Sequence, residues 1–311
     1  MGLVSSIIDQ NFPPKATWDT SLIPDLTGRV IIVTGGNSGL GYETAKALLS
    51  HNAKVYVACR DRAKTDVAIE SLKKETGKTA FFLELDLASL ASVKACADSF
   101  MKIETELHVL FNNAGVMSPP ISHLTQDGYD LQFGVNVLGH FYLTELLLPA
   151  LKAGAASSAD HVSRVINTSS QMHLLAKMDY DTLTDTTQRK KISPSDLYAQ
   201  STFGKIVFSQ ELARRYGTQG IVSIALHPGN LKTDLGRHLP ALLRRIVHMT
   251  CYPPPKGALT QLWGGTVPEA ASMNGKYLIP WARVGEPRKD ALDPKIGGDL
   301  WEWMETQVRG I

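Results

Sequence analysis

The stretch that decides the fold is residues 30–41, which read VIIVTGGNSGLG. Four apolar residues open it, as is typical of a strand buried on both faces of a sheet. The glycines that follow allow a tight turn and a close approach of the backbone to a ligand. A helical pattern begins at residue 40, and the start of such a helix offers free N–H groups to a phosphate. We therefore predict a dinucleotide-binding loop, with a plain glycine turn as the alternative. Its residues are Gly35, Asn37, Ser38, Gly39, Leu40 and Gly41.

Strand patterns and helix patterns alternate along the rest of the chain. The predicted strands cover 30–33, 55–59, 79–85, 107–111, 164–167, 221–226 and 276–279. The predicted helices cover 40–51, 62–76, 89–104, 127–154, 196–216 and 256–264. Strands separated by helices indicate a parallel sheet with helices on both faces. The sequence thus predicts an α/β fold, a single Rossmann-type doubly wound domain with a parallel seven-stranded sheet.

The end of the second predicted strand bears on the choice of cofactor. A site that prefers NAD carries a carboxylate at this place to bind the ribose hydroxyls, but the chain has Cys59 there. Arg60 follows, and a guanidinium suits a 2′-phosphate. We therefore predict NADP(H) as the cofactor, with a solvated surface arginine as the alternative for Arg60. Asp61 is the residual argument for NAD.

Two segments flank or interrupt the predicted domain. Residues 1–28 form an N-terminal arm with a short apolar helical stretch, and residues 29–311 form the catalytic domain. We expect the arm to pack over the domain; peripheral membrane contact is the alternative, and the opening MGLVSS also fits the myristoylation pattern. A substrate lid is predicted around 234–255, where an apolar face favours a small hydrophobic substrate.

Composition excludes several functional classes. The chain has 311 residues, 43% of them hydrophobic, and 32 basic against 30 acidic residues give a net charge of +2, so no nucleic-acid partner is expected. Its three cysteines are far apart, which argues against a disulfide framework and favours a reducing, cytoplasmic location, with membrane association as the alternative. No His, Asp and Glu spacing suggests a metal site.

Seven short motifs occur in a characteristic order. They are TGGNSGLG at 34–41, Asp86, NNAG at 112–115, Asn136 in VNVLG, Ser170 in NTSS, Tyr198-x-x-Ser201 and Pro228-Gly229. Together they resemble the short-chain dehydrogenase/reductase family from about residue 27 to 235. Later segments, such as Tyr252-Pro253-Pro254-Pro255, resemble its retinol-dehydrogenase-like branch, particularly the fungal members.

The resemblance implies a role for each matching residue. Ser170 would bind the substrate carbonyl, and Tyr198 would act as general acid in reduction or general base in oxidation. Asn136 would hold a water of the proton relay. The cofactor would be bound by Asp86 at the adenine with Leu87 beside it, by Asn113, Ala114 and Gly115, and at the nicotinamide end by Pro228, Gly229 and Thr233. The long predicted helices resemble the surfaces that this family uses for homodimers.

The chain departs from the family at one catalytic position. The family has a lysine one helical turn after the tyrosine, where the cation lowers the pKa of the phenol. Here that position is Thr202, which carries no charge. Lys205 is the nearest cation in sequence and either substitutes in part for the lysine or has a structural role. His173 is a candidate proton donor or a loop residue in contact with substrate or solvent, and for His227 we expect packing.

The sequence favours an NADP(H)-dependent oxidoreductase that interconverts a hydrophobic carbonyl and an alcohol, with reduction as the preferred direction. A neutral tyrosine can still donate a proton, so the loss of the lysine harms oxidation more than reduction. Thr202 leaves alternatives open: a non-redox enzyme such as an isomerase, dehydratase or cyclase, a cofactor-binding pseudoenzyme, or a lysine-to-threonine variant made to trap a complex.

Overall fold

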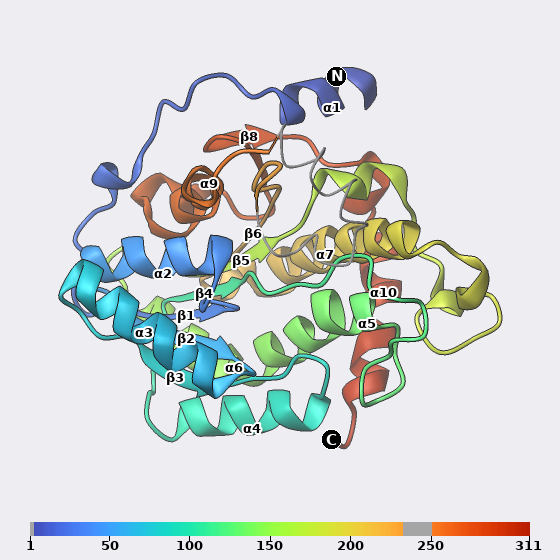
Figure 1. Cartoon of the computed structure of the whole chain (residues 1–311), viewed down its shortest axis with the longest axis horizontal. Helices are drawn as coiled ribbons and strands as arrows, with labels where there is room; N and C mark the ends of the chain where they lie inside the picture. The colour runs from blue at the N-terminus through green and yellow to red at the C-terminus, as the bar shows by residue number, and fades with distance from the viewer. Residues whose placement is uncertain (1–2, 233–250) are drawn as a thin grey trace.

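The computed structural model describes residues 3–232 and 251–311 (Figure 1). Its strands form one sheet in the order β3-β2-β1-β4-β5-β6-β7-β8. Their bounds are Val30–Thr34 (β1), Lys54–Cys59 (β2), Phe81–Glu84 (β3), Val109–Asn112 (β4), Ser163–Thr168 (β5), Ile221–Leu226 (β6), Tyr277–Ile279 (β7) and Arg283–Gly285 (β8). Thr233 and most of the predicted lid around 234–255 lie outside the described residues.

The first seven strands run parallel, which confirms the predicted fold class. The predicted number of strands is wrong by one, because β8 pairs antiparallel with β7 at the edge of the sheet. Its three residues are only partly buried or exposed. A strand this short and this exposed leaves no apolar run in the sequence, so the pattern that revealed the others could not reveal it.

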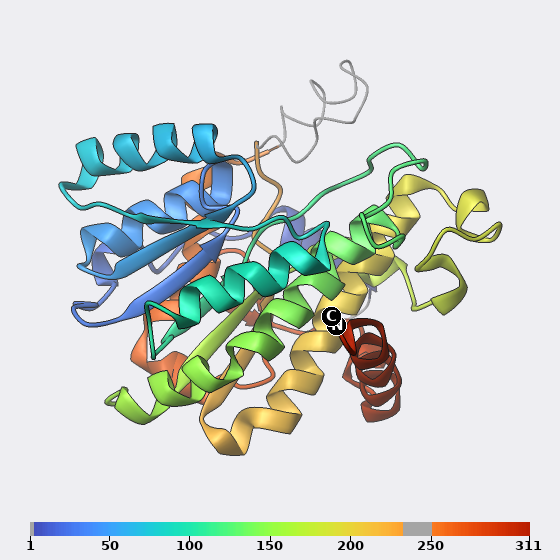
Figure 2. The same cartoon turned by 90° about the horizontal axis from the view of Figure 1, so that it is seen from below.

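Helices cover both faces of the sheet, as predicted. Alternate residues of β1 belong to different cores: Val30 and Ile32 pack with α4, α6, α7 and α10, whereas Ile31 and Val33 pack with α2, α3 and α9. Figure 2 shows α4, α6 and α7 lying across the first of these faces. The helices are Leu3–Asn11 (α1), Gly39–Ser50 (α2), Arg62–Thr76 (α3), Leu90–Met101 (α4), Leu131–Phe133 (α5), Gly139–Ser157 (α6), Pro194–Tyr216 (α7), Pro254–Thr266 (α9) and Pro294–Val308 (α10).

The helix predicted over 127–154 is divided. Its central turn, Gly134–Leu138, is a π-helix between α5 and α6, in which the N–H of Gly139 donates to the carbonyl of Gly134 five residues earlier. Residues 127–130 precede the first helical turn, and Asp130 accepts from the backbone N–H groups of Gln132 and Phe133 at 3.0 Å. The wider turn redirects backbone carbonyls, and it occurs at Asn136.

The N-terminal arm runs along one side of the domain (Figure 1). Its helix α1 is followed by an extended stretch in which Trp18, Ile23 and Leu26 are buried in the core shared with α2 and α9. No helix in the described part of the chain is both long and apolar enough to cross a membrane.

Candidate functional site

The glycine loop lies at the carboxyl end of β1, where the sheet order reverses between β2 and β4. Gly35 has a φ of +67°, a conformation that favours glycine. A Cβ at Gly41 would lie 2.3 Å from the carbonyl oxygen of Gly35, so the first turn of α2 packs against the loop only because residue 41 has no side chain. The hydroxyl of Ser38 is exposed and makes no capping bond to α2. The hydroxyl and the first N–H groups of the helix therefore face the position that a phosphate would take.

The ends of β2 and β3 supply the groups expected around the adenosine. Cys59 is buried, and burial raises the pKa of its thiol. Arg60 is exposed and has no ion-pair partner among the described residues. Asp61 caps α3, because its carboxylate accepts from the backbone N–H of Lys64 at 3.0 Å. The Asp61 carboxylate is thus already engaged, while the Arg60 guanidinium pairs with none of the described carboxylates.

Asp86 follows β3, with buried Leu87 next to it. One carboxylate oxygen of Asp86 accepts from the backbone N–H of Ala88 at 3.0 Å. Ser89, not Asp86, is the N-cap of α4. The side chain of Asp86 is half-buried and not committed to the helix, which fits a contact with the adenine.

The NNAG segment is locked to β1. The backbone N–H groups of Asn113 and Ala114 both donate to the hydroxyl of Thr34 at 2.9 Å, and the Asn113 amide donates to the Thr34 carbonyl at 2.9 Å. A Cβ at Gly115 would lie 3.2 Å from Oδ1 of Asn136, so the segment also passes close to the π-turn. These contacts hold the NNAG segment against the end of β1, beside the loop at which the cofactor would bind.

Hydrogen bonds with Val116, Ser201 and Lys205 fix the position of Asn136. Its Oδ1 accepts from the backbone N–H of Val116 at 2.9 Å, and its Nδ2 donates to the carbonyl of Val116 and to the hydroxyl of Ser201. Because the π-turn interrupts the α-helical hydrogen-bond pattern, the backbone carbonyl of Asn136 can accept from side chains. Lys205 Nζ donates to this carbonyl at 2.7 Å. Ser201 lies one turn after Tyr198, so Asn136 fixes the position of α7 relative to the π-turn.

Ser170 and Tyr198, which the motif predicts as the reacting pair, lie within hydrogen-bonding reach of each other. Ser169 donates its hydroxyl to the backbone carbonyl of Thr202 at 2.8 Å and is therefore turned into α7. Ser170 remains on the open side as the N-cap of the short helix η3, Gln171–Leu175. Burial raises the pKa of Tyr198 to about 12, and its interaction with the Ser170 hydroxyl opposes part of this rise. Tyr198 is therefore a neutral proton donor at physiological pH.

The hydrogen bonds of Thr202 and Lys205 describe the departure from the family pattern. The hydroxyl of Thr202 donates back to the carbonyl of Ala199 at 2.8 Å, as a helical threonine often does. Lys205 is 1% exposed, and its amine contacts Asn136 and Nδ1 of His140, the latter at 2.8 Å. Among residues 3–232 and 251–311, no cation lowers the pKa of the Tyr198 phenol. The amine of Lys205 is thus used to join α7 to the helix of Asn136.

His140 was not predicted as a site residue, although its spacing from Asn136 was a signal in the sequence. It lies one helical turn after Asn136, and its Nε2 is 2.9 Å from the hydroxyl of Thr34. Burial and the neighbouring Lys205 lower its pKa well below the usual value. A neutral imidazole therefore connects Lys205 to the end of β1, from which the glycine loop starts.

Two other histidines lie beneath the site. His173 is fully buried; its Nδ1 is 2.7 Å from the Ser170 carbonyl, and its Nε2 accepts from the backbone N–H of Arg288. Burial lowers its pKa to about 4, so its place is in the support of the Ser170 loop. His227 is also buried, and neither ring nitrogen has a partner within the described residues.

The predicted nicotinamide end is partly described. Gly229 has a φ of +91°, and a Cβ there would lie 2.9 Å from the indole of Trp281, so the turn after Pro228 requires glycine. Thr233, predicted to help bind the carboxamide, lies outside the described residues.

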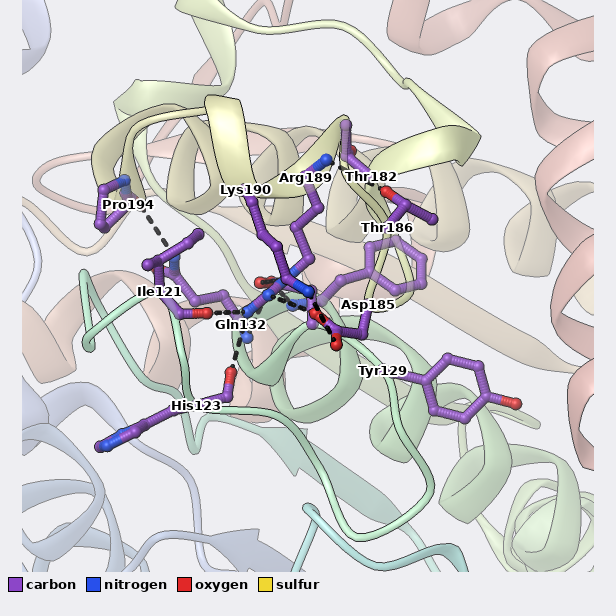
Figure 3. Close-up of polar contacts among 12 residues, drawn as sticks. Ile121, His123, Tyr129, Gln132, Thr182, Asp185, Thr186, Arg189, Lys190 and Pro194 are labelled. Atoms are coloured by element: carbon purple, nitrogen blue, oxygen red, sulfur yellow. Dashed lines mark hydrogen bonds and ion pairs between the residues drawn. The ribbon is translucent and has the colours of Figure 1, made fainter.

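A buried ion pair, which was not predicted from the sequence, links the loop after the NNAG segment to the residues just before α7 (Figure 3). Arg189 is 1% exposed, and its Nε donates to Asp130 at 2.9 Å. Its Nη2 donates to the backbone carbonyls of Ile121 and His123, in the loop that follows the NNAG segment. Asp130 caps the helical turn that leads to Asn136, and Arg189 lies just before α7. The guanidinium therefore links the loop at 121–123 and the turn that starts at Asp130 to the segment that leads into α7.

Comparison with known proteins agrees with this geometry. The short chain dehydrogenase family model matches residues 29–180. A short-chain dehydrogenase/reductase of Armillaria gallica is 52% identical over 99% of both chains. Human retinol dehydrogenase 14 is 35% identical, over 90% of this chain and 86% of that protein. The crystal structure of an uncharacterised protein from Mycobacterium paratuberculosis superposes with a TM-score of 0.74 at 29% identity and covers 94% of this chain and 98% of that chain.

The Armillaria gallica relative shares about half of its residues with this chain over almost the whole length of both, which is enough to assign the chain to a family. With the glycine loop, the Asn136 π-turn and the Ser170–Tyr198 pair in place, the chain belongs to the short-chain dehydrogenase/reductase family of nicotinamide-dependent oxidoreductases.

Proposed function

We propose that the protein is an NADP(H)-dependent reductase of hydrophobic aldehydes or ketones. The observation that carries the proposal is the state of Tyr198, a buried phenol beside Ser170 with a pKa of about 12. A group that stays protonated can give a proton to a carbonyl oxygen, but it cannot readily take one from an alcohol. Reduction is therefore the favoured direction.

The residues around the glycine loop fit a dinucleotide. Because residue 41 has no side chain, the first turn of α2 packs closely against the loop, and Ser38 and the start of α2 offer donors to a pyrophosphate. Bound there, NADPH would supply the hydride. The preference for NADP(H) is supported by Arg60, which is exposed, and by Asp61, whose carboxylate caps α3.

In the proposed reaction, Ser170 and Tyr198 hold the substrate oxygen between them. Tyr198 donates its phenolic proton as charge develops on that oxygen, and Ser170 keeps the oxygen in line. Asn136, Ser201 and Lys205 fix the helix on which Tyr198 stands. The hydrophobic substrate class is supported by the apolar pattern of the predicted lid, and the lid itself remains a prediction.

A second candidate is supported by Thr202. Its hydroxyl is engaged with Ala199, and Lys205 is engaged with Asn136 and His140, so neither residue gives the phenol the cation that redox cycling normally uses. On this account the fold binds its cofactor and catalyses an isomerisation, dehydration or cyclisation, or serves as a cofactor-binding pseudoenzyme. The cytoplasmic location, the homodimer and the membrane contact of the N-terminal arm likewise remain predictions.

The proposal is tested by following NADPH oxidation with a panel of aliphatic and aromatic aldehydes and cyclic ketones. We expect turnover of apolar members and its loss by a factor of about 10² to 10⁴ in Tyr198→Phe, because the proton donor is removed. NADPH binding, measured by fluorescence titration, should be unchanged in that variant. Full activity of Tyr198→Phe would contradict the assigned role, and no turnover in the wild type with NADPH bound would favour the non-redox account.

A further inference from the structure

Three side-chain amides from distant parts of the chain meet beside the proposed active site. Asn11 Nδ2 donates to Gln171 Oε1 at 2.8 Å, and Gln171 Nε2 donates back to Asn11 Oδ1 at 3.0 Å. Gln171 Nε2 also donates to Asn230 Oδ1 at 3.1 Å, and Asn230 Nδ2 donates to Asn11 Oδ1. Each of the three amides thus bonds to the other two, and we refer to Asn11, Gln171 and Asn230 as the amide cluster.

Two members of the amide cluster are direct neighbours of predicted site residues. Gln171 follows Ser170, which would bind the substrate oxygen, and Asn230 follows the Pro228-Gly229 turn at the predicted nicotinamide end. Asn11 is the last residue of α1. The N-terminal helix therefore contacts both loops that would hold substrate and nicotinamide, although it lies outside the family motifs.

The helix is also attached to the edge of the sheet. The Tyr277 hydroxyl on β7 donates to Gln10 Oε1 at 3.1 Å, and both side chains are buried. Arg283 on β8 pairs with Asp9 at 3.0 Å. Figure 1 shows α1 next to β8, at the end of the extended arm. These anchors fix α1 independently of the amide cluster, so the helix is a rigid support for Asn11 and not a segment held by Asn11 alone.

Amide side chains are suited to this task because each has both donors and acceptors. A closed set of mutual hydrogen bonds restricts all three groups at once, and the loss of one partner leaves the other two without some of theirs. We infer that α1 is a part of the active site, in which Asn11 is a positioning residue that holds the Ser170 loop and the Asn230 loop at a fixed separation. The inference concerns the same site as the proposed function and rests on it.

The test compares Asn11→Leu, which keeps the size of the side chain and removes its amide, with Ser5→Ala, a change at an exposed position of the same helix. Hydrogen exchange is measured at the backbone N–H of His173, which bonds to Ser170, and of Lys232, which bonds to Tyr252. We expect exchange at both positions to become at least tenfold faster in Asn11→Leu and to stay unchanged in Ser5→Ala. Exchange in α3, on the far side of the sheet, should stay unchanged in both.

Kinetics then relate the positioning to the reaction. With the aldehyde that the wild type reduces fastest, Asn11→Leu should lower kcat/KM about tenfold, while NADPH affinity and the melting temperature stay close to those of Ser5→Ala. The double variant Asn11→Leu/Gln171→Leu should lose little more than Asn11→Leu alone, because the amides act as a unit. Multiplicative losses would mean that the two residues act separately and would overturn the inference.

The exchange measurement separates this inference from the proposed function. If no carbonyl compound is reduced but exchange at His173 and Lys232 rises in Asn11→Leu, the proposed reaction fails and the positioning role stands. Unchanged exchange in the two loops, or an equal rise in α3, would overturn the positioning role whatever the activity.

Discussion

The amine of Lys205 lies 2.7 Å from the backbone carbonyl of Asn136, with both groups buried. The same amine is 2.8 Å from His140, and no carboxylate within the described residues pairs with it. Burial lowers the pKa of Lys205 well below its usual value. The contact therefore joins α7 to the π-turn through a buried lysine whose pKa is lowered by desolvation.

The lowered pKa of Lys205 makes stability depend on pH. Between its lowered pKa and the pKa of an unfolded lysine, the unfolded chain binds one proton more than the native chain, so the free energy of unfolding rises with pH. The expected slope is about 1.4 kcal/mol per pH unit. Lys205→Met should remove this slope between pH 7.5 and 9.5, as measured by urea denaturation. Lys190→Met, at an exposed position, should keep it. Parallel curves for wild type and Lys205→Met would show that the lysine is charged in the native state.

The pKa of Tyr198 predicts different pH profiles for the two directions of the reaction. Since the phenol titrates at about 12, the ionised form needed for alcohol oxidation should increase about tenfold per pH unit from pH 7 to 10. Reduction uses the protonated form and should stay flat over the same range. Initial rates with NADP and an alcohol, and with NADPH and the matching carbonyl, check both profiles; an oxidation rate that is flat above pH 7 would argue for an unrecognised cation near the phenol.

Restoring the family lysine should shift the balance between the directions. In Thr202→Lys a cation one turn after Tyr198 would lower the pKa of the phenol, and each unit corresponds to about 1.4 kcal/mol. We expect alcohol oxidation to rise more than carbonyl reduction and its pH profile to level off at lower pH. Thr202→Met, which has a long side chain without charge, is the matched control. If cofactor binds to Thr202→Lys but no redox activity follows with any carbonyl or alcohol, the non-redox account replaces the reductase.

Arg60 should decide between the cofactors. A charge-assisted hydrogen bond contributes about 1.5–3 kcal/mol, so Arg60→Ala should weaken NADPH binding by roughly 10- to 100-fold and leave NADH binding unchanged. Arg62→Ala is a suitable control, because Arg62 already pairs with Asp66 and stacks on Phe82. Calorimetry with both cofactors gives the two affinities, and equal losses for NADPH and NADH would remove Arg60 from the phosphate site.

Arg189 should matter for stability more than any surface charge. Arg189→Met leaves Asp130 buried without its partner, which is expected to cost about 3–5 kcal/mol of the free energy of unfolding. Lys190→Met breaks only an exposed pair with Asp185 and should cost less than about 1 kcal/mol. Denaturation of the two variants under the same conditions measures the difference, and similar costs would mean that water replaces the guanidinium.

Hydrophobic patterns along the chain were sufficient to predict the fold class. The alternation of apolar strands with helices determined the parallel sheet and both helical layers, because central strands such as β1 and β6 are buried along their whole length. The edge strand β8 and the helix α10 were not predicted. The former is too short to show a period, and the latter follows this unpredicted strand and the short helix η9, Lys289–Leu292, so no predicted strand leads directly into it.

Candidate site residues could be named where a family motif places a chemical type at a matching position, as for Ser170 and Tyr198. They could not be named where a role depends on contact between distant segments. Arg189 meets Asp130 across 59 positions, and Asn11 meets Asn230 across 219. The reach of Lys205 could be estimated from helix geometry, but its partners depend on how α7 packs against the π-turn.

The π-turn at Gly134–Leu138 also has a consequence for the evolution of the chain. It contains one residue more than an α-helical turn of the same extent, so it amounts to a single-residue insertion in an otherwise continuous helix. Removal of one residue from this turn would restore an α-helix and leave α6 facing its core, whereas a deletion inside α6 would rotate all later side chains by about 100°. The carbonyl geometry at Asn136 can therefore be lost in one step without loss of the scaffold. A descendant with an intact fold, but without the Asn136 carbonyl that Lys205 now contacts, is a single deletion away.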